Sequence, residues 1–276
     1  MITVDCYNCK SSAHTHYCDE NGFSLVRCDG CGLLYIRERP EDAQIDEATA
    51  VGQHHGDKTL DANVHYNPSI KTEYRGALKS LFNGDFSGIE TWLDVGCGYG
   101  EFLETISEAS GGKVSVFGSE PNQVKQAHDK KRGLNVDYFD LTTHDRKYDM
   151  VSLMNVYSHL SDPNAFIGDM KNVVKPGGRL LIETGDAAGF SYEDILKPLC
   201  LPDHLSFASE KILTDMLTRH GFTVEKTYRC ADLPLRPLPF LKEVVKAVLP
   251  GYDSFLKYYL KWWKYQDSRL YILARL

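Results

Sequence analysis

The sequence lacks the features of a membrane-spanning or exported protein. None of its apolar runs approaches the roughly 18 residues that a membrane-spanning helix requires. Its first ten residues, MITVDCYNCK, contain no basic stretch followed by an apolar one and do not resemble a signal peptide. Positive charge is also scarce, because 31 Lys and Arg residues face 38 Asp and Glu and leave a net charge of −7. Nucleic-acid binding requires a basic surface, so we expect the protein to act on a small molecule. Since it shows neither a membrane-spanning run nor a signal peptide, we expect it in the cytoplasm.

The composition is otherwise that of a folded globular chain. Hydrophobic residues make up 42% of the 276 positions and charged residues 25%, which allows a core of normal size. A chain of this length accommodates one large domain and a small module. We expect a module at residues 1–40, a connector and helical cap at 41–90, and a main domain at 91–276. The connector holds His54 and His55 in a polar stretch, where adjacent histidines are usually solvated.

Half of the eight cysteines fall into two C-x-x-C pairs near the N-terminus, Cys6 with Cys9 and Cys28 with Cys31. In a reducing compartment such pairs indicate a metal site rather than disulfides. Two C-x-x-C turns supply the four thiolates of a tetrahedral structural zinc. The intervening ENG predicts a turn between two short strands. The pattern therefore predicts a zinc ribbon held by these four cysteines.

The other residues of this module favour a structural or substrate-positioning role. Four basic side chains face five acidic ones within residues 1–40, which is a poor electrostatic footprint for phosphates. Cys18, His14 and His16 lie near the predicted zinc. A small buried thiol and exposed histidines are the commoner state of such residues, so we leave the three outside the ligand set.

From residue 91 the chain alternates between strand-like and helix-like segments. Seven strands are predicted, at TWLDV, KVSVFGSE, LNVDYFD, YDMVSLMN, RLLIETG, FTVEKTY and RLYILARL. The helical segments between them carry their own end signals, as in ASEKILTDMLTRHG, where Ser209 is the expected N-cap and Gly221 follows the end. The alternation predicts an α/β fold with a Rossmann-like, mostly parallel sheet covered by helices on both faces.

The stretch LDVGCGYGEF, residues 93–102, predicts a strand, a tight turn and a helix start that together hold a nucleotide-like ligand. A dinucleotide fingerprint requires G-x-G-x-x-G with a pyrophosphate at the helix N-terminus. Here the glycines are Gly96, Gly98 and Gly100. Asp94 and Glu101 bracket the loop and would repel a pyrophosphate, but they suit the ammonium and sulfonium of S-adenosylmethionine. Glu120, after the second strand, can accept hydrogen bonds from the ribose hydroxyls of either ligand.

These motifs resemble those of class I S-adenosylmethionine-dependent methyltransferases. LDVGCGYGEFL resembles their first motif, GSEPN their second, and VVKPGGRLLIETGD the segment through their fifth strand. NVYSHLSDP resembles the stretch after their fourth strand, with Ser158 in place of the usual Glu and His159 retained. The likeness covers about residues 66–230 and the last strand. The zinc ribbon and DHLSFASEKILTDMLTRHGF are similar to bacterial methyltransferases that modify sugars.

The resemblance implies roles for individual residues around the cofactor. Asp94 and the three glycines would surround the methionine end of S-adenosylmethionine, and Glu120 would hold its ribose. Asp140, after the third strand, would face the adenine amino group, although it could instead cap a turn. Asn155, at the end of the fourth strand, would lie under the cofactor.

A hydroxyl acceptor must lose a proton during methyl transfer, and a positioned histidine can take it. His204 is the first candidate, since the similar sugar C-methyltransferases have a Glu-His pair where this chain has Asp203-His204. The alternative is that His204 only holds its loop by hydrogen bonds. His159 is the second candidate, with a structural role favoured. Tyr157 and Tyr192 are possible substrate contacts.

Residues 231–268 form an expected helical insertion before the last strand. FLKEVVKAVLPG places apolar residues on one helical face, and YDSFLKYYLKWWKYQD is rich in aromatic side chains with a narrow charged stripe. We favour a lid or a dimer face for this insertion, with contact to a membrane surface or a lipid-linked substrate as the alternative.

The leading hypothesis is an enzyme of carbohydrate biosynthesis that methylates a hydroxyl of a sugar or sugar-linked metabolite, with S-adenosylmethionine as cofactor and a structural zinc. The alternatives are a sugar C-methyltransferase, an RNA base methyltransferase and a non-catalytic partner that binds the cofactor. MNVY, after the fourth strand, disfavours the RNA enzymes, many of which carry Asn-Pro-Pro-Tyr there.

Overall fold

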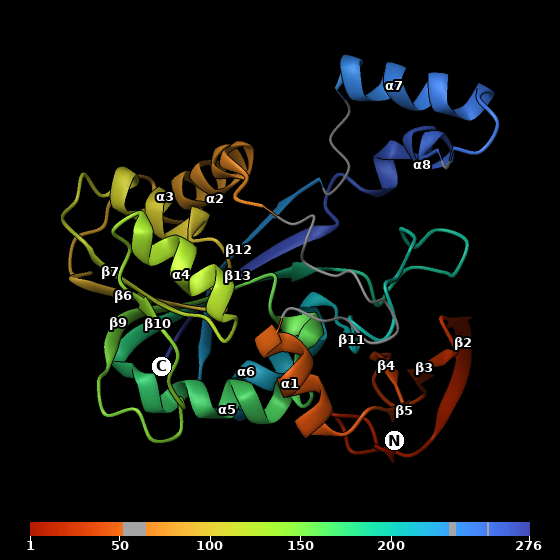
Figure 1. The fold of residues 1–276 in the computed structure, drawn as a ribbon. Coiled ribbons are helices and arrows are strands. Elements are labelled where there is room, and N and C mark those ends of the chain that lie inside the picture. Colours follow the sequence, from red (N-terminus) through yellow and green to blue (C-terminus); the bar gives the residue numbers. More distant parts are fainter. Residues whose placement is uncertain (52–64, 232–235, 253) are drawn as a thin grey trace.

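The computed structural model describes residues 1–51, 65–231, 236–252 and 254–276, and the histidine pair at 54 and 55 lies outside them. Its centre is a seven-stranded sheet (Figure 1). In spatial order the strands are β12 (Thr223–Cys230), β13 (Arg269–Arg275), β10 (Val174–Gly185), β9 (Tyr148–Met154), β6 (Thr91–Val95), β7 (Ser115–Ser119) and β8 (Val136–Asp137). Among the described residues, six strands of this sheet run in one direction and β13 runs in the opposite one. The predicted mostly parallel, Rossmann-like sheet is confirmed.

Helices cover both faces of the sheet (Figure 1). On one face lie α2 (Lys71–Phe82) and α3 (Glu101–Ala109), and on the other α5 (Pro163–Val173) and α6 (Glu210–Arg219). Consecutive residues of β6 explain this arrangement, because Trp92 packs with the α2 and α3 side chains while Leu93 packs with those of α5 and α6. Successive strand residues point to opposite faces, so a strand buried on both sides is apolar throughout. A fifth helix, α4 (Gln123–Lys131), follows β7.

A second sheet has four antiparallel strands, in the order β11 (Ser206–Phe207), β4 (Leu34–Ile36), β3 (Phe23–Cys28) and β2 (His14–Glu20). The last three belong to the N-terminal ribbon, and a two-stranded pairing of β1 (Ile2–Thr3) with β5 (Glu38–Arg39) completes it. β11 comes from the main domain, after β10. The N-terminal ribbon is therefore joined to the main domain through a shared sheet.

The connector predicted for residues 41–90 is helical at both ends. Its acidic start forms α1 (Asp42–Val51), and a 3-10 turn, η2 (Pro68–Ile70), leads into α2. α2 ends at Asn83, which adopts a left-handed φ of 52°. α1 buries only Ile45 among its described residues. One buried apolar side chain is too few to give the segment a helical periodicity.

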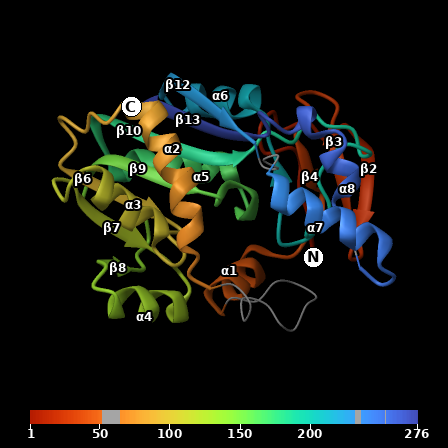
Figure 2. The same ribbon diagram turned by 90° about the horizontal axis from the view of Figure 1, so that it is seen from above.

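The insertion between β12 and β13 is a helical hairpin. It consists of α7 (Pro237–Val248), the short α8 (Leu256–Tyr259) and the 3-10 turn η4 (Trp262–Lys264). In both views the hairpin lies at the same end of the molecule as the N-terminal module (Figures 1 and 2). None of the helices in the described part of the chain is long and apolar enough to cross a membrane.

Candidate functional site

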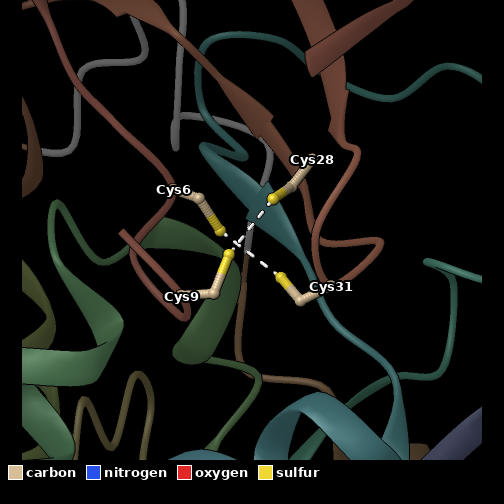
Figure 3. Close-up of side chains that lie close together, drawn as sticks. All are labelled: Cys6, Cys9, Cys28 and Cys31. Atoms are coloured by element: carbon tan, nitrogen blue, oxygen red, sulfur yellow. Dashed lines mark hydrogen bonds between the residues drawn. The ribbon is translucent and has the colours of Figure 1, made fainter. Parts of the chain in front are cut away.

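The four cysteines of the two C-x-x-C pairs converge on one point (Figure 3). The Sγ atoms of Cys6 and Cys31 are 3.4 Å apart, and those of Cys9 and Cys28 are 3.3 Å apart. All four sulfurs lie within 4.8 Å of one another. Four thiolates around a zinc at about 2.3 Å lie roughly 3.8 Å from each other, so this cluster has the size of a tetrahedral metal site.

A small residue and a hydrogen bond between two thiols both favour the cysteine cluster. A Cβ on Gly30 would lie only 3.2 Å from the Sγ of Cys9, so a larger residue there would crowd the sulfurs. The hydrogen bond from the Cys6 thiol lowers the pKa of Cys31 and raises that of Cys6, so this pair holds one sulfur as the thiolate that a metal binds. The donor set is chemically suited to zinc. Cys18, His14 and His16 lie outside this group, as expected.

The glycine loop lies where the order of the parallel strands reverses. β6 is flanked by β7, the next strand along the chain, and by β9, which is reached only after β8. Ligands of open α/β sheets bind at this position, beyond the carboxyl ends of the strands. Gly96 has a φ of 71°, and a Cβ on it would lie 2.5 Å from Cγ2 of Val156, which follows β9. The loop after β6 therefore packs against the segment after β9.

Asp94 is a buried carboxylate at the end of β6, with an exposed fraction of 1%. The hydroxyl of Ser152 on β9 donates to its Oδ1 at 2.5 Å, and the indole of Trp92 donates to that hydroxyl at 2.9 Å. Oδ2 of Asp94 is buried and has no hydrogen-bond partner in the described structure. Burial raises the pKa of Asp94 to about 8. Because unpartnered buried oxygens are destabilising, this oxygen is suited to a donor or cation supplied by a ligand.

The structure describes each of the other residues expected at the cofactor. Glu120 accepts hydrogen bonds from the backbone N–H of Gly98 at 2.8 Å and of Asn122 at 2.9 Å, which anchors its carboxylate beside the loop. Asn155 follows β9 with a left-handed φ of 58° and is exposed. Asp140 caps a turn through Thr142, which was the alternative expected for it.

The three residues expected to act on the acceptor come together in space. The rings of His159 and His204 have centroids 4.7 Å apart, and one ligand atom from each ring lies within 4.8 Å of an oxygen of Asp203. His159 belongs to the 3-10 turn η3 (Tyr157–His159) after β9, whereas Asp203 and His204 precede β11. The backbone N–H of Leu205 donates to the carbonyl of Ser158 at 2.6 Å and joins the two segments.

Hydrogen bonds to backbone carbonyls set the tautomer of both imidazoles. Nδ1 of His204 lies 2.9 Å from the carbonyl oxygen of Leu199, and Nδ1 of His159 lies 3.0 Å from that of Asp203. A carbonyl can only accept, so in the neutral rings Nδ1 carries the proton and Nε2 carries the lone pair. Each ring is thus prepared to accept a proton at Nε2.

The ribbon holds the loop that carries His204. The carboxylate of Glu20, at the end of β2, accepts from the backbone N–H of Leu199 at 2.9 Å and of Leu201 at 3.1 Å. The side-chain amide of Asn21 donates to the carbonyl of Leu201 at 2.8 Å. Glu20 and Asn21 belong to the turn predicted at ENG, and nothing in that motif indicated this contact.

Two further features were not apparent from the sequence. Asp129 on α4 is fully buried, and burial raises its pKa to about 7. Its Oδ1 would lie 3.4 Å from a Cβ on Gly100, so it lines the back of the glycine loop. Tyr157 was expected as a possible substrate contact, but it is wholly buried with its hydroxyl 3.9 Å from the sulfur of Met216. Tyr192 is exposed and packs edge-on against Tyr17.

Comparison with known proteins identifies the main domain. A family model described as a methyltransferase domain matches residues 53–227. A ubiquinone biosynthesis O-methyltransferase from Klebsiella pneumoniae is 33% identical over 99 residues, which cover 33% of this chain and 41% of that protein. One from Salmonella enteritidis is 32% identical over 107 residues, covering 36% of this chain and 44% of that protein. The chain spans about two fifths of the length of these curated relatives.

Solved structures share the fold at low sequence identity. A putative sarcosine dimethylglycine methyltransferase from Galdieria sulphuraria has a TM-score of 0.53 and 16% identity, covering 75% of this chain and 86% of that one. The [4+2]-cyclase SpnF has a TM-score of 0.52 and 19% identity, covering 83% and 90%. Since one fold carries proteins named for such different reactions, the reaction has to be argued from the site.

Proposed function

The chain belongs to the methyltransferase domain family, and on that premise we propose that it transfers a methyl group from S-adenosylmethionine to a hydroxyl of a small polar acceptor. The observation that carries this proposal is the pairing of two sites at the carboxyl edge of the sheet. One is the glycine loop with the unpartnered Oδ2 of Asp94. The other is the imidazole pair of His159 and His204, which follows β9 and precedes β11.

The residues around the glycine loop suit this cofactor. Asp94 would accept from the ammonium of the methionine end, which would give its buried Oδ2 a partner. Glu120, whose carboxylate two backbone N–H groups anchor beside the loop, would accept from the ribose hydroxyls. Asn155 would lie under the cofactor. When bound, S-adenosylmethionine supplies a methyl group already activated by its sulfonium.

The role of the protein at the acceptor is to orient a hydroxyl and to take its proton. We assign the proton to Nε2 of His204, because the Leu199 carbonyl holds Nδ1. Asp203 and His159 complete the cluster and would orient the acceptor and the base. A positioned base contributes about 10²- to 10⁴-fold to a rate, and alignment of the two reactants contributes further.

The acceptor that we favour is a hydroxyl on a sugar or sugar-linked molecule, on the likeness of DHLSF and the ribbon to sugar-modifying enzymes. A second candidate is a quinone-related hydroxyl, because the curated relatives are named for ubiquinone biosynthesis. Both are O-methylations. The cysteine cluster would hold a structural zinc that fixes the ribbon against the loop carrying His204.

The function is tested by the release of S-adenosylhomocysteine from purified protein supplied with methyl-labelled S-adenosylmethionine and host extract. The extract is divided into aqueous and lipid fractions, and the labelled product is characterised by mass spectrometry and NMR. We expect the label in a methyl ether. Label on carbon or nitrogen would overturn O-methylation. Tight cofactor binding with no product from either fraction would support the non-catalytic alternative.

A further inference from the structure

The helical hairpin of residues 236–264 is the surface from which we draw a further inference. We propose that it docks the protein on a membrane surface containing anionic phospholipid, with the apolar face of α7 inserted among the headgroups. The docking itself does not depend on the proposed methyl transfer.

Exposed apolar side chains are concentrated on this hairpin. Of the thirteen large hydrophobic residues that are exposed in the described structure, eight belong to it: Leu238, Leu241, Val245, Val248, Leu249, Tyr252, Leu260 and Trp263. The other five are scattered over the rest of the chain. Single exposed apolar residues are ordinary, but a contiguous group of this kind marks an interaction site.

The apolar residues of α7 form a stripe along one side of the helix. Leu238, Leu241, Val245 and Val248 follow each other at intervals of three or four residues, which places them on one face. Leu238 and Val248 are 80% and 77% exposed. Lys242 and Lys246 each follow a member of the stripe and so lie along its edge. An apolar stripe bordered by lysines is typical of a helix that lies in a membrane interface.

The hairpin is held together by its other face, so its own packing leaves the stripe uncovered. Glu243 is the one described residue that α7 buries, and its carboxylate accepts from the backbone N–H of Phe255 at 2.7 Å and from Lys246 at 2.8 Å. The ring of Phe240 packs edge-on against Tyr259 of α8. These contacts fix α7 on α8 with the stripe directed elsewhere.

The other end of the hairpin is anchored to the segment that leads to His204. Asp194 receives hydrogen bonds from Lys261 at 3.0 Å and from Lys264 at 2.6 Å. The hydroxyl of Tyr265 donates to the carbonyl of Asp194 at 2.7 Å. Docking through α7 would therefore act on the same stretch of chain, residues 186–205, that carries the expected base.

Charge selects an anionic membrane over a second copy of this chain. Residues 236–264 contain six basic and two acidic residues, a net +4, while the whole chain is −7, so the rest carries −11. A symmetric dimer would place this +4 surface against itself, and like charges disfavour such contact. Anionic headgroups attract it. The exposed Trp263 and Tyr252 suit the boundary between headgroups and acyl chains.

The experiment is flotation of the purified full chain with phosphatidylcholine vesicles, with and without about a third phosphatidylglycerol. We expect flotation with the anionic vesicles that weakens as salt is raised. The double variant Leu241→Asp, Val245→Asp should bind at least tenfold more weakly. Val124→Asp changes an exposed apolar residue on α4, outside the hairpin, and should float like the unmodified protein. Circular dichroism and binding of S-adenosylhomocysteine verify that each variant is folded.

Three outcomes would overturn the proposal. The first is an unmodified protein that stays unbound to anionic vesicles. The second is a double variant that floats as well as the unmodified protein. The third is a dimer in light scattering that the double variant abolishes, which would assign the stripe to a second copy. Binding of S-adenosylhomocysteine is measured without vesicles, so a protein that binds it but does not float has a failed docking surface and an intact cofactor site.

Discussion

The Nδ1 atom of His204 lies 2.9 Å from the carbonyl oxygen of Leu199, and the N–H of that same Leu199 is held by Glu20 of the ribbon. The ring that we assign as the base is thus oriented by a loop, and the loop is oriented by a module nearly two hundred positions earlier in the chain. This arrangement makes the base, its orientation and the metal cluster separately testable.

Replacing His204 tests whether the ring is a base or only a tie for its loop. In His204→Asn the side-chain amide can still donate to the Leu199 carbonyl, but the proton acceptor at Nε2 is lost. We expect kcat to fall by about 10²- to 10⁴-fold, with the affinity for S-adenosylhomocysteine unchanged. The two quantities are measured by product release and by isothermal titration calorimetry. Near-normal turnover in His204→Asn would assign His204 a structural role.

Replacing Asp94 tests the cofactor site. Asp94→Asn keeps an acceptor for Ser152 but removes the negative charge. We expect the affinity for S-adenosylhomocysteine to fall at least tenfold, since each charge-assisted hydrogen bond contributes about 1.5–3 kcal/mol. The fall should be larger at pH 9 than at pH 6, because the carboxylate with a pKa of about 8 is ionised only at the higher pH. Equal affinities of the two proteins at pH 9 would contradict this assignment.

Asp94→Asn should also change how the free energy of unfolding of the ligand-free protein depends on pH. Burial raises the pKa of Asp94 from 3.8 to about 8, so between these values the folded protein binds more protons than the unfolded chain. The free energy of unfolding contributed by this group therefore falls as pH rises through that range. Asp94→Asn should gain stability relative to the unmodified protein from pH 6 to pH 9 in urea titrations. A constant difference across this range would show that Asp94 does not titrate there.

Replacing Glu20 tests the clamp between the ribbon and the loop. Glu20→Ala leaves the N–H groups of Leu199 and Leu201 without their acceptor, so the loop and His204 lose their fixed position. We expect kcat to fall about tenfold, since misplacement of a catalytic group lowers rates steeply, with zinc content and cofactor affinity unchanged. Asp19→Ala is the matched control, because Asp19 is exposed and contacts Ser24 and His16 instead. Equal activity of the two variants would show that the clamp has no role in turnover.

Replacing one cysteine tests the metal cluster. We expect one zinc per chain by mass spectrometry of the purified protein, and a small fraction of that in Cys9→Ser, which removes one of four ligands. The free energy of unfolding should fall by several kcal/mol, because zinc binding contributes directly to folding. Cys200→Ser, at an exposed thiol outside the cluster, should keep its zinc. Absence of zinc from the unmodified protein, or its retention in Cys9→Ser, would count against the cluster as a zinc site.

The predictions from the sequence succeeded where the signal was local. The alternation of buried strands and amphipathic helices specified the sheet, because a strand covered on both faces must be apolar along its length. The C-x-x-C spacing specified which four sulfurs meet. The helical insertion expected at 231–268 contains α7, α8 and a 3-10 turn, but only the structure shows that the last two bring Tyr258 and Tyr265 into contact.

The sequence by itself determined the sheet, the glycine loop at its carboxyl edge and the cysteine cluster, because each depends on residues that are neighbours along the chain or on one periodicity. Only the tertiary structure decided that β11 joins the ribbon sheet, that Glu20 holds the loop of His204, and that His159 meets Asp203. These contacts join segments far apart in sequence through backbone N–H and carbonyl groups. Every residue carries those groups, so no pattern of side chains could have indicated which of them would pair.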